Sequence, residues 1–135
     1  MIRTVYVAGP YSGDTDANIA KALFYADQLL EVGYVPYVPH LSHYWNLEYS
    51  HDYETWMGQC LEWVARCDAL VRVPGKSPGA DREVEHANYL NIPVFYTLQE
   101  LYEYKPKEEY WNYPTPVIEC EGKTACRGVN FKTRG

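Results

Sequence analysis

The residues best suited to chemistry lie in one run near the middle of the chain, residues 61–83. The run reads as the end of a helix, a buried strand, a loop, and a new helix opened by Ser-Pro-Gly. Asp68 stands where the strand begins, Ser77 at the start of the second helix, and Glu83 further inside it. Two carboxylates thus flank a unit whose helix N-terminus favours anions, which is the layout of a small-molecule site.

The elements that must position these residues alternate between strands and helices. Short apolar runs bounded by Gly and Pro predict strands, and apolar residues at helical spacing predict helices. The predicted strands are 4–8, 34–39, 69–73 and 93–97, and the predicted helices are one capped by Asp14 or Asp16 and ended by Gly33, then 53–67, 80–90 and 98–104. Residues 39–52 are expected to form an irregular loop, and the prolines of the second strand favour a sheet edge.

This alternation predicts an α/β fold: a flavodoxin- or Rossmann-like, doubly wound parallel sheet of four to five strands with helices on both faces. Ligands of such folds bind outside the carboxyl ends of the strands, at the switch point of the strand order. Three loops emerge at that edge, namely residues 9–12, 39–52 and 74–79. We therefore expect these loops to build one pocket.

Composition limits the partners of the chain. Its 135 residues fit one domain, assigned to residues 1–104, followed by an aromatic and polar extension over residues 105–135. The net charge of −6, without a basic stripe, argues against polymeric nucleic acid as a partner. No apolar run is long enough to span a membrane, and the N-terminus enters a strand at once, so we expect a cytoplasmic protein.

Cysteines and histidines give little support for a metal. None of the 4 cysteines forms a Cys-x-x-Cys pair, so reduced thiols packed as small apolar groups are expected. His40 and His43 are three residues apart without a third ligand nearby. We predict neither a metal nor a cofactor. The 14 tyrosines and 4 tryptophans indicate instead a subunit interface or a pocket that stacks on a base.

Four motifs in order carry a family resemblance over roughly residues 3–98. They are Tyr-x-x-Gly from Tyr6, Leu-Glu-Trp at residues 61–63, Asp68 at the start of a strand, and Ser-x-Gly-x-x-x-Glu-x-x-x-Ala from Ser77. With them the chain resembles the nucleoside 2-deoxyribosyltransferase-like superfamily, which includes deoxyribosyltransferases and 5′-monophosphate N-glycosidases. The Ser-Pro-Gly-Ala-Asp form of the last motif looks closest to a subgroup of small phage and bacterial proteins.

The resemblance implies catalytic roles for three residues. Glu83 would attack C1′ of the sugar and form a glycosyl ester, which water or a second base then resolves. Asp68 would meet the base and give a proton to its ring nitrogen as the bond breaks. Tyr6 would hydrogen-bond Glu83 and hold its rotamer. Each also has a structural interpretation: a solvated helix residue for Glu83, a cap for Asp68 and a core position for Tyr6.

Other residues are expected to contact substrate. They are Gly9, Pro10, Tyr11, Ser77, Gly79, His43 and Trp45. The resemblance implies that Gly9 lets the backbone approach the sugar, whereas Pro10 and Tyr11 replace a Ser- and Arg-bearing loop of related nucleotide hydrolases. In the pocket wall beside His43, either Tyr44 or Trp45 would stack on the base.

The residue at position 77 bears on the choice between nucleoside and nucleotide. Transferases of the family tend to carry an acid there, which accepts a hydrogen bond from a free 5′-hydroxyl. Ser77 at a helix N-terminus, with Lys76 beside it and Arg82 in the same turn, suits a 5′-phosphate instead. A plain N-cap role for Ser77 remains open.

The function we expect is cleavage or transfer of the N-glycosidic bond of (deoxy)nucleosides or their 5′-monophosphates through a covalent glycosyl-Glu83 intermediate. Hydrolysis of a nucleoside monophosphate is favoured. The alternatives are base exchange by a nucleoside 2-deoxyribosyltransferase, a nucleotide-binding module of the same fold without turnover, and an assembly protein. A homo-oligomer is expected, because relatives complete their pockets with a neighbour's residues.

Overall fold

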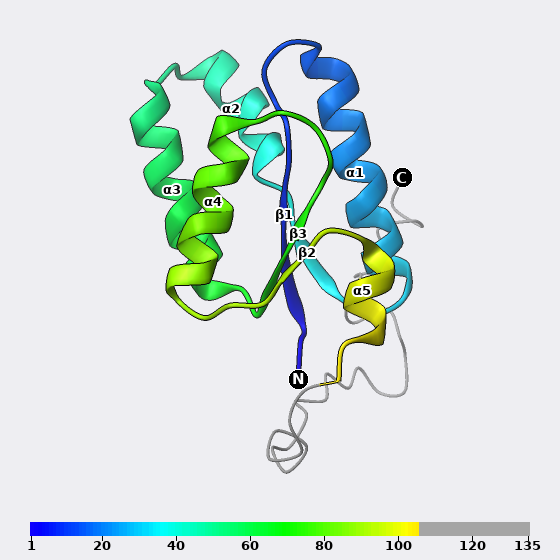
Figure 1. Ribbon diagram of the computed structural model, residues 1–135. Helices are drawn as coiled ribbons and strands as arrows, with labels where there is room; N and C mark the ends of the chain where they lie inside the picture. The colour runs from blue at the N-terminus through cyan, green and yellow to red at the C-terminus, as the bar shows by residue number, and fades with distance from the viewer. Residues whose placement is uncertain (106–135) are drawn as a thin grey trace, which may run out of the picture. The chain divides into compact units, whose positions relative to one another are not determined.

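The computed structural model describes residues 1–105, in which four parallel strands form one sheet in the order β2-β1-β3-β4 (Figure 1). The strands are β1 (Thr4–Ala8), β2 (Val35–Tyr37), β3 (Ala69–Arg72) and β4 (Val94–Phe95). The helices are α1 (Thr15–Glu31), the 3₁₀ helix η1 (Pro39–Leu41), α2 (Ser42–Glu48), α3 (Tyr53–Arg66), α4 (Pro78–Tyr89) and α5 (Leu98–Glu103). The predicted α/β fold is confirmed. Most of the predicted C-terminal extension, residues 106–135, lies outside the described residues.

Alternate residues of the central strands divide the core into two layers. Val5 and Val7 of β1 pack with buried residues of α1 and α5. Tyr6 of β1 and Leu70 of β3 point to the other face and pack with α3 and α4. Figure 1 shows α1 and α5 on one side of the sheet and α3 and α4 on the other. Helices therefore cover both faces, which explains why these strands are apolar throughout.

Side-chain caps begin the helices that frame the sheet. Asp14, one of the two caps expected for α1, accepts a hydrogen bond from the Ala17 N–H at 3.2 Å. Ser77 does the same for α4 through the Ala80 N–H at 3.0 Å. Gly33 follows α1 with φ of 104°, a left-handed conformation that glycine adopts without steric cost. The local sequence thus sets where both helices start.

Two parts of the fold differ from the sequence prediction. The segment expected to be an irregular loop, residues 39–52, forms η1 and α2 over most of its length. No residue of α2 is buried, so its sequence carries no apolar period that would indicate a helix packed on the core. Trp63 falls on the apolar face of the predicted helix over residues 53–67, which predicts a core position. In α3 it is instead 42% exposed and stacks on the Tyr37 ring, with centroids 5.1 Å apart.

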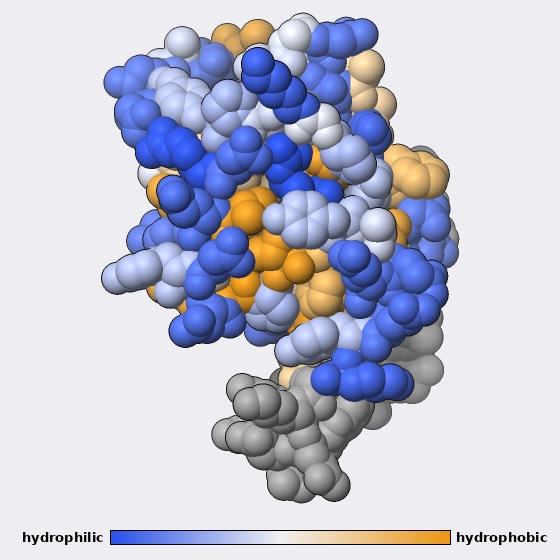
Figure 2. All heavy atoms as spheres, in the orientation of Figure 1, coloured by the Kyte–Doolittle hydropathy of each residue, from blue (hydrophilic) through white to orange (hydrophobic). Residues whose placement is uncertain are grey.

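The outer surface is uneven in polarity. The face seen in Figure 2 carries apolar side chains between α4 and α5, over the part of the sheet where β4 forms an edge. The other edge strand is β2, as its prolines predict. No helix within residues 1–105 is long and apolar enough to cross a bilayer.

The strand order places a switch point between β1 and β3. From β1 the chain moves outward to β2 on one side, and later returns through β3 to β4 on the other. The loops after β1 and β3 diverge there, at the carboxyl edge of the sheet. They also pack closely, because a Cβ on Gly9 would lie 2.8 Å from the Val73 Cβ. Glycine at position 9 therefore serves the packing of these two loops.

Candidate active site

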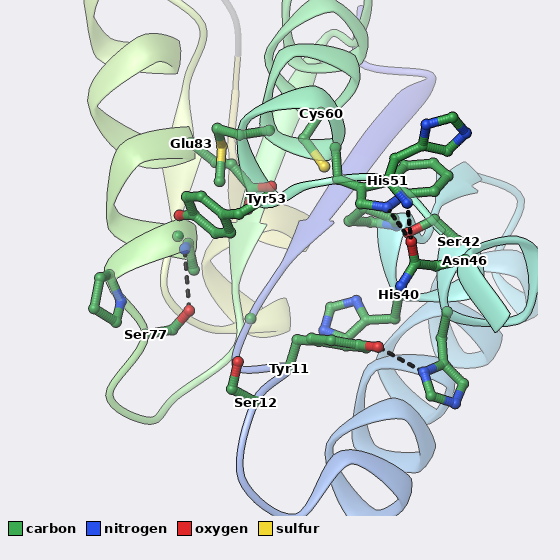
Figure 3. A pocket seen from close by; sticks show the side chains of 18 of the residues that line it. Tyr11, Ser12, His40, Ser42, Asn46, His51, Tyr53, Cys60, Ser77 and Glu83 are labelled. Atoms are coloured by element: carbon green, nitrogen blue, oxygen red, sulfur yellow. Dashed lines mark hydrogen bonds between the residues drawn. The ribbon is translucent and has the colours of Figure 1, made fainter. Parts of the chain in front are cut away.

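A pocket of about 670 Å³ opens at the carboxyl edge of the sheet (Figure 3). Its volume suits a small organic ligand. It is lined by Gly9, Tyr11 and Ser12 after β1; Pro39, His40, Ser42, His43, Asn46 and His51 between β2 and α3; Tyr53, Trp56, Met57 and Cys60 of α3; and Lys76, Ser77, Pro78, Gly79, Ala80 and Glu83 after β3. The predicted convergence of three loops is confirmed, and α3 contributes a wall that the sequence did not indicate.

Glu83 of α4 is the carboxylate of this pocket. Its side chain is only 5% exposed although it lines the cavity. The hydroxyl of Tyr6, which is fully buried beneath it, donates a hydrogen bond to Glu83 Oε2 at 2.6 Å. The expected contact between the two residues is confirmed. Tyr6 is at once a core residue and a support of Glu83, so the two interpretations of this position do not exclude each other.

Burial changes the acidity of Glu83. Loss of solvent raises its pKa from 4.5 to about 7, although hydrogen bonds from Tyr6 and Cys60 and the charge of Arg72 each act to lower it. Burial also raises the pKa of Tyr6 well above 10, so its hydroxyl remains a donor. Near neutral pH the Glu83 carboxyl therefore populates both protonation states, which suits a nucleophile or a proton-transfer group.

Arg72, at the end of β3, holds the loop that leads to α4. Its guanidinium is buried and donates to the carbonyl oxygens of Val73 and Gly75, the latter at 2.9 Å. It also forms an ion pair with Asp81 at 3.0 Å. Since Ser77 lies between these partners, Arg72 fixes the backbone that carries the helix start into the pocket.

The start of α4 forms one end of the pocket. Ser77, Gly79 and Lys76 all line it. A Cβ on Gly79 would lie 3.2 Å from the Tyr53 hydroxyl oxygen, so glycine allows this phenol to approach the helix start. Arg82 does not line the pocket, because its guanidinium is paired with Glu54 at 2.9 Å. Of the two cations that the sequence suggested for this end of the pocket, Lys76 and Arg82, only Lys76 lines it.

His40, in the wall of the pocket, has a ring nitrogen that can accept a hydrogen bond but receives none from the described residues. Its Nε2 lies 3.0 Å from the carbonyl oxygen of Pro10, which can only accept, so Nε2 carries the proton. Burial lowers the pKa of His40, which keeps the ring neutral. The other nitrogen, Nδ1, is buried and has no hydrogen-bond partner among the described residues. A buried acceptor without a partner costs free energy.

Two further contacts order the wall between β2 and α3. The Tyr11 hydroxyl and His43 Nδ1 are 2.5 Å apart, which links the loop after β1 to α2. Asn46 Oδ1 accepts from the His51 backbone N–H at 2.8 Å and from Trp56 Nε1 at 2.7 Å. The predicted wall residues Tyr11 and His43 thus lie in the pocket. Asn46 and His51 were missed, because nothing in their spacing indicated a fold-back onto α3.

Asp68 does not lie in the pocket, which corrects its expected position. It precedes β3, at the amino edge of the sheet, and its Oδ2 accepts from the backbone N–H groups of Arg3 at 2.8 Å and Thr4 at 3.0 Å. The pocket opens at the opposite, carboxyl edge. A residue just before a parallel strand is separated from the ligand edge by the strand itself. Asp68 therefore joins β3 to the start of β1.

Pro10 and Trp45 are also placed outside the lining, which corrects two expected substrate contacts. Pro10 supports the pocket from behind: its carbonyl holds His40, and its ring lies 2.7 Å from the point where a Cβ on Gly75 would stand. Trp45 is 54% exposed and packs edge-on against Trp56, with ring centroids 5.0 Å apart. The aromatic residue of this pair that faces the cavity is Trp56.

Within residues 1–105 no group of three or more His, Cys, Asp or Glu side chains is placed to hold a metal ion. Cys60 and Cys67 are free thiols there, whereas Cys120 and Cys126 lie outside the described residues. The pocket lining offers carboxyl, hydroxyl, thiol and imidazole groups for chemistry.

Comparison with known proteins places the chain in a family. Residues 3–97 match the family described as a domain of unknown function, DUF7768, and because this match covers more than half of the chain, the protein belongs to that family. The matched segment begins just before β1 and ends after β4, so it includes the whole sheet and the pocket. No curated protein matches the sequence.

Proposed function

We propose that this protein cleaves or transfers the N-glycosidic bond of (deoxy)nucleosides or their 5′-monophosphates, with hydrolysis of a monophosphate as the favoured reaction. One observation carries the proposal: the Glu83 carboxyl is buried in the wall of a ligand-sized pocket, with its Oε2 2.6 Å from the Tyr6 hydroxyl. A carboxyl held in the wall of such a pocket can act, in its ionised form, as the nucleophile of a two-step displacement at C1′.

In the first step a lone pair of the Glu83 carboxylate forms a bond to C1′. The C1′–N bond breaks, and its electron pair leaves with the base. In the second step water attacks C1′ and gives a proton to the group that protonated the departing base, while the ester bond breaks and its electron pair returns to the carboxylate. Two displacements retain the configuration at C1′. Tyr6 supports both steps because its hydrogen bond limits the rotation of Glu83.

The departing base needs a proton. Asp68 does not supply it, because it lies at the other edge of the sheet. The proposal assigns the proton to the imidazoles of the wall, His43 and His51, since histidine is the side chain that most readily exchanges protons near neutral pH. It follows that the base lies against the segment between β2 and α3.

The 5′-phosphate is assigned to the start of α4. This helix is 12 residues long and follows the Ser77 cap. Gly79 of the helix and Lys76, just before the cap, both line the pocket. A helix N-terminus, a hydroxyl and an ammonium group all favour an anion. An acid at position 77 would repel a phosphate, which is why the monophosphate is preferred over the nucleoside.

A second candidate function is a nucleotide-binding module without turnover. The placement of Asp68 outside the pocket favours it, because the pocket then lacks the acidic partner that the resemblance implies. Base exchange, the third possibility, shares the first displacement with hydrolysis. It differs only in that a second base, rather than water, attacks the glycosyl ester.

One experiment separates these functions. The full chain is incubated with a panel of nucleosides and 5′-monophosphates, and free base is measured by chromatography. The proposal predicts base release, faster from monophosphates, lost in Glu83→Gln and kept in Glu85→Gln, which changes an exposed acid on the same helix. A new nucleoside after addition of a second base would identify exchange. Binding without base release by the wild type would identify the binding module and reject the enzyme.

The prediction of a homo-oligomer is retained as part of the proposal. The apolar surface over the β4 edge supports it, because monomeric proteins rarely leave such a surface in water (Figure 2). Light scattering coupled to size-exclusion chromatography measures the mass directly. A monomeric mass at micromolar concentration would contradict this part of the proposal.

A further inference from the structure

Asn46 of α2 is a polar residue of the pocket wall that the proposed mechanism does not use. Its Oδ1 accepts two hydrogen bonds, one from the His51 backbone N–H at 2.8 Å and one from Trp56 Nε1 at 2.7 Å. Figure 3 shows both bonds meeting at this oxygen, with the nitrogen on the other arm of the amide. The Asn46 side chain is therefore tied to α3 and to the segment that leads to it.

The two donors fix which way the Asn46 amide lies. A backbone N–H and an indole N–H can only donate, so the atom that faces them must be the oxygen. An amide oxygen has two lone pairs, and these two hydrogen bonds use both. Turning the amide over would set its NH₂ group against two other N–H groups. What Asn46 can still offer a ligand is therefore the pair of N–H donors on Nδ2.

The Nδ2 atom of Asn46 is accessible. Within residues 1–105 it has no hydrogen-bond partner, yet the only buried side-chain nitrogen or oxygen that lacks one in that part of the chain is His40 Nδ1. Since Nδ2 is not buried and Asn46 lines the cavity, the pocket presents an oriented and unused donor on the wall between β2 and α3.

We propose that Asn46 selects bases that carry a carbonyl oxygen, rather than an amino group, at C6 of a purine or C4 of a pyrimidine. This role rests on the proposed function, which lays the base against the same wall. Nδ2 donates to the carbonyl oxygen, whereas adenine or cytosine brings an amino donor against an amide donor. Asparagine can read adenine by donating and accepting at once. At Asn46 that is not open, because the oxygen is already occupied.

The position of Asn46 indicates which edge of the base it meets. Figure 3 shows Asn46 across the pocket from Glu83, the residue assigned to C1′. C6 of a purine and C4 of a pyrimidine lie on the side of the base remote from the glycosidic bond. A base whose sugar is at Glu83 therefore turns this edge toward Asn46.

The test uses two pairs of 5′-monophosphates: inosine against adenosine monophosphate, and uridine against cytidine monophosphate, each with ribose and with 2-deoxyribose. The members of a pair differ only in this group and in the proton on the adjacent ring nitrogen. The ratio within each pair is taken from kcat/KM of base release by the full chain, or from the dissociation constant measured by calorimetry where no base is released. The wild type is expected to prefer the carbonyl member by roughly tenfold or more.

Asn46→Asp turns the donor into an acceptor. One carboxylate oxygen can still accept from His51 and Trp56, while the other replaces the NH₂ group. The variant is expected to reverse the preference in both pairs, and the ratio cancels the effect of the added charge on the shared phosphate. Asn88→Asp adds the same charge at an exposed position of α4 outside the pocket and is expected to keep the wild-type ratios. Asn46→Ala removes the donor without supplying an acceptor, so its ratios should approach one.

Reversed ratios in Asn46→Asp support the proposal. Equal use of both members by the wild type overturns it, as does a variant that weakens all the nucleotides by one factor, since Asn46 would then only hold the wall. If Asn46→Asp does not fold, the ratios of Asn46→Ala decide. Binding with the expected ratios but no base release would reject the proposed catalysis and keep the role of Asn46. Base release with unmoved ratios would do the opposite, and no binding of any nucleotide by the wild type would overturn both.

Discussion

Asp68 and Glu83 are two carboxylates that the sequence assigned to one site, yet the fold places them at opposite edges of the sheet. Asp68, just before β3, is exposed, and its carboxylate accepts hydrogen bonds from the backbone N–H groups of Arg3 and Thr4. Glu83 is buried and accepts a hydrogen bond from the Tyr6 hydroxyl at the pocket. The difference teaches that the edge of a parallel sheet, rather than the residue type, decides which acid can meet a ligand.

The two environments also differ in solvent access. Asp68 is exposed, whereas Glu83 is buried, and burial raises the pKa of Glu83 to about 7. A buried carboxyl destabilises the fold once it is charged. The protein thus keeps at Glu83 a group that is unfavourable for stability near neutral pH, which is expected where a side chain serves chemistry.

The sharpest way to break this comparison is to remove each carboxylate in turn. Glu83→Gln should lower the rate of base release by roughly 10³-fold or more, because it removes the proposed nucleophile. Asp68→Asn should change kcat/KM by less than about threefold, because the group lies outside the pocket. The measurement is the initial rate of base release from the best substrate of the panel. Equal losses of rate in both variants would indicate that Asp68 takes part in catalysis.

The pH dependence of stability sharpens the contrast. Because the folded-state pKa of Glu83 is raised, its contribution to stability is fully present below 4.5 and is lost as the pH rises through about 7. Glu83→Gln cannot become charged, so it should be more stable than the wild type at pH 8, by at most about 3 kcal/mol, and similar at pH 4. Urea unfolding across this range measures the difference. A difference independent of pH would contradict the buried, titrating carboxyl.

Tyr6→Phe tests the support of Glu83 with a smaller effect. It removes the 2.6 Å hydrogen bond but keeps the ring in the core. Since this bond lowers the pKa of Glu83, its loss should move the acidic limb of the kcat/KM profile upward by roughly 1 pH unit. The rate at pH 7 should fall roughly fivefold, because less of Glu83 is then ionised. An unchanged profile would mean that Tyr6 is a core residue only.

The smallest expected effect is at Asp68. Asp68→Ala deletes an acceptor of two backbone N–H groups and should reduce the free energy of unfolding by about 1 to 2 kcal/mol. Its kcat/KM should remain that of the wild type. Denaturant unfolding and the base-release assay on the same sample check both statements. Loss of activity at unchanged stability would invert the roles assigned to the two acids.

The sequence predicted the elements whose signals are local. Apolar runs gave the strands, and Asp14, Gly33 and Ser77 set helix ends through their own hydrogen bonds or backbone conformation. It failed for α2, whose residues are all at least partly exposed and carry no period of burial. The sequence also failed to predict the exposure of Trp63, because an apolar helical face does not indicate how much of each side chain is buried.

Of the site, the sequence predicted the residues that sit at fixed places in strand and loop. Tyr6, Ser77 and Glu83 lie as expected relative to one another. The position of Asp68 was wrong because a motif gives order along the chain and not the edge of the sheet. Cys60 and the acceptor of His40 were missed, because each depends on which side chain of another element stands opposite. Contacts between distant elements leave no mark in local sequence.

The central claim, a covalent bond between Glu83 and the sugar, is tested most directly by trapping it. The full chain is incubated with a 2′-fluoro analogue of its best substrate, which slows the second displacement, then digested and examined by mass spectrometry. The account predicts that the peptide containing Glu83 gains the mass of the fluorinated sugar, or of that sugar with its 5′-phosphate. The gain should be seen in the wild type and in Glu85→Gln but not in Glu83→Gln. Release of base from this analogue with an unmodified Glu83 peptide, or an adduct on another residue, would contradict it.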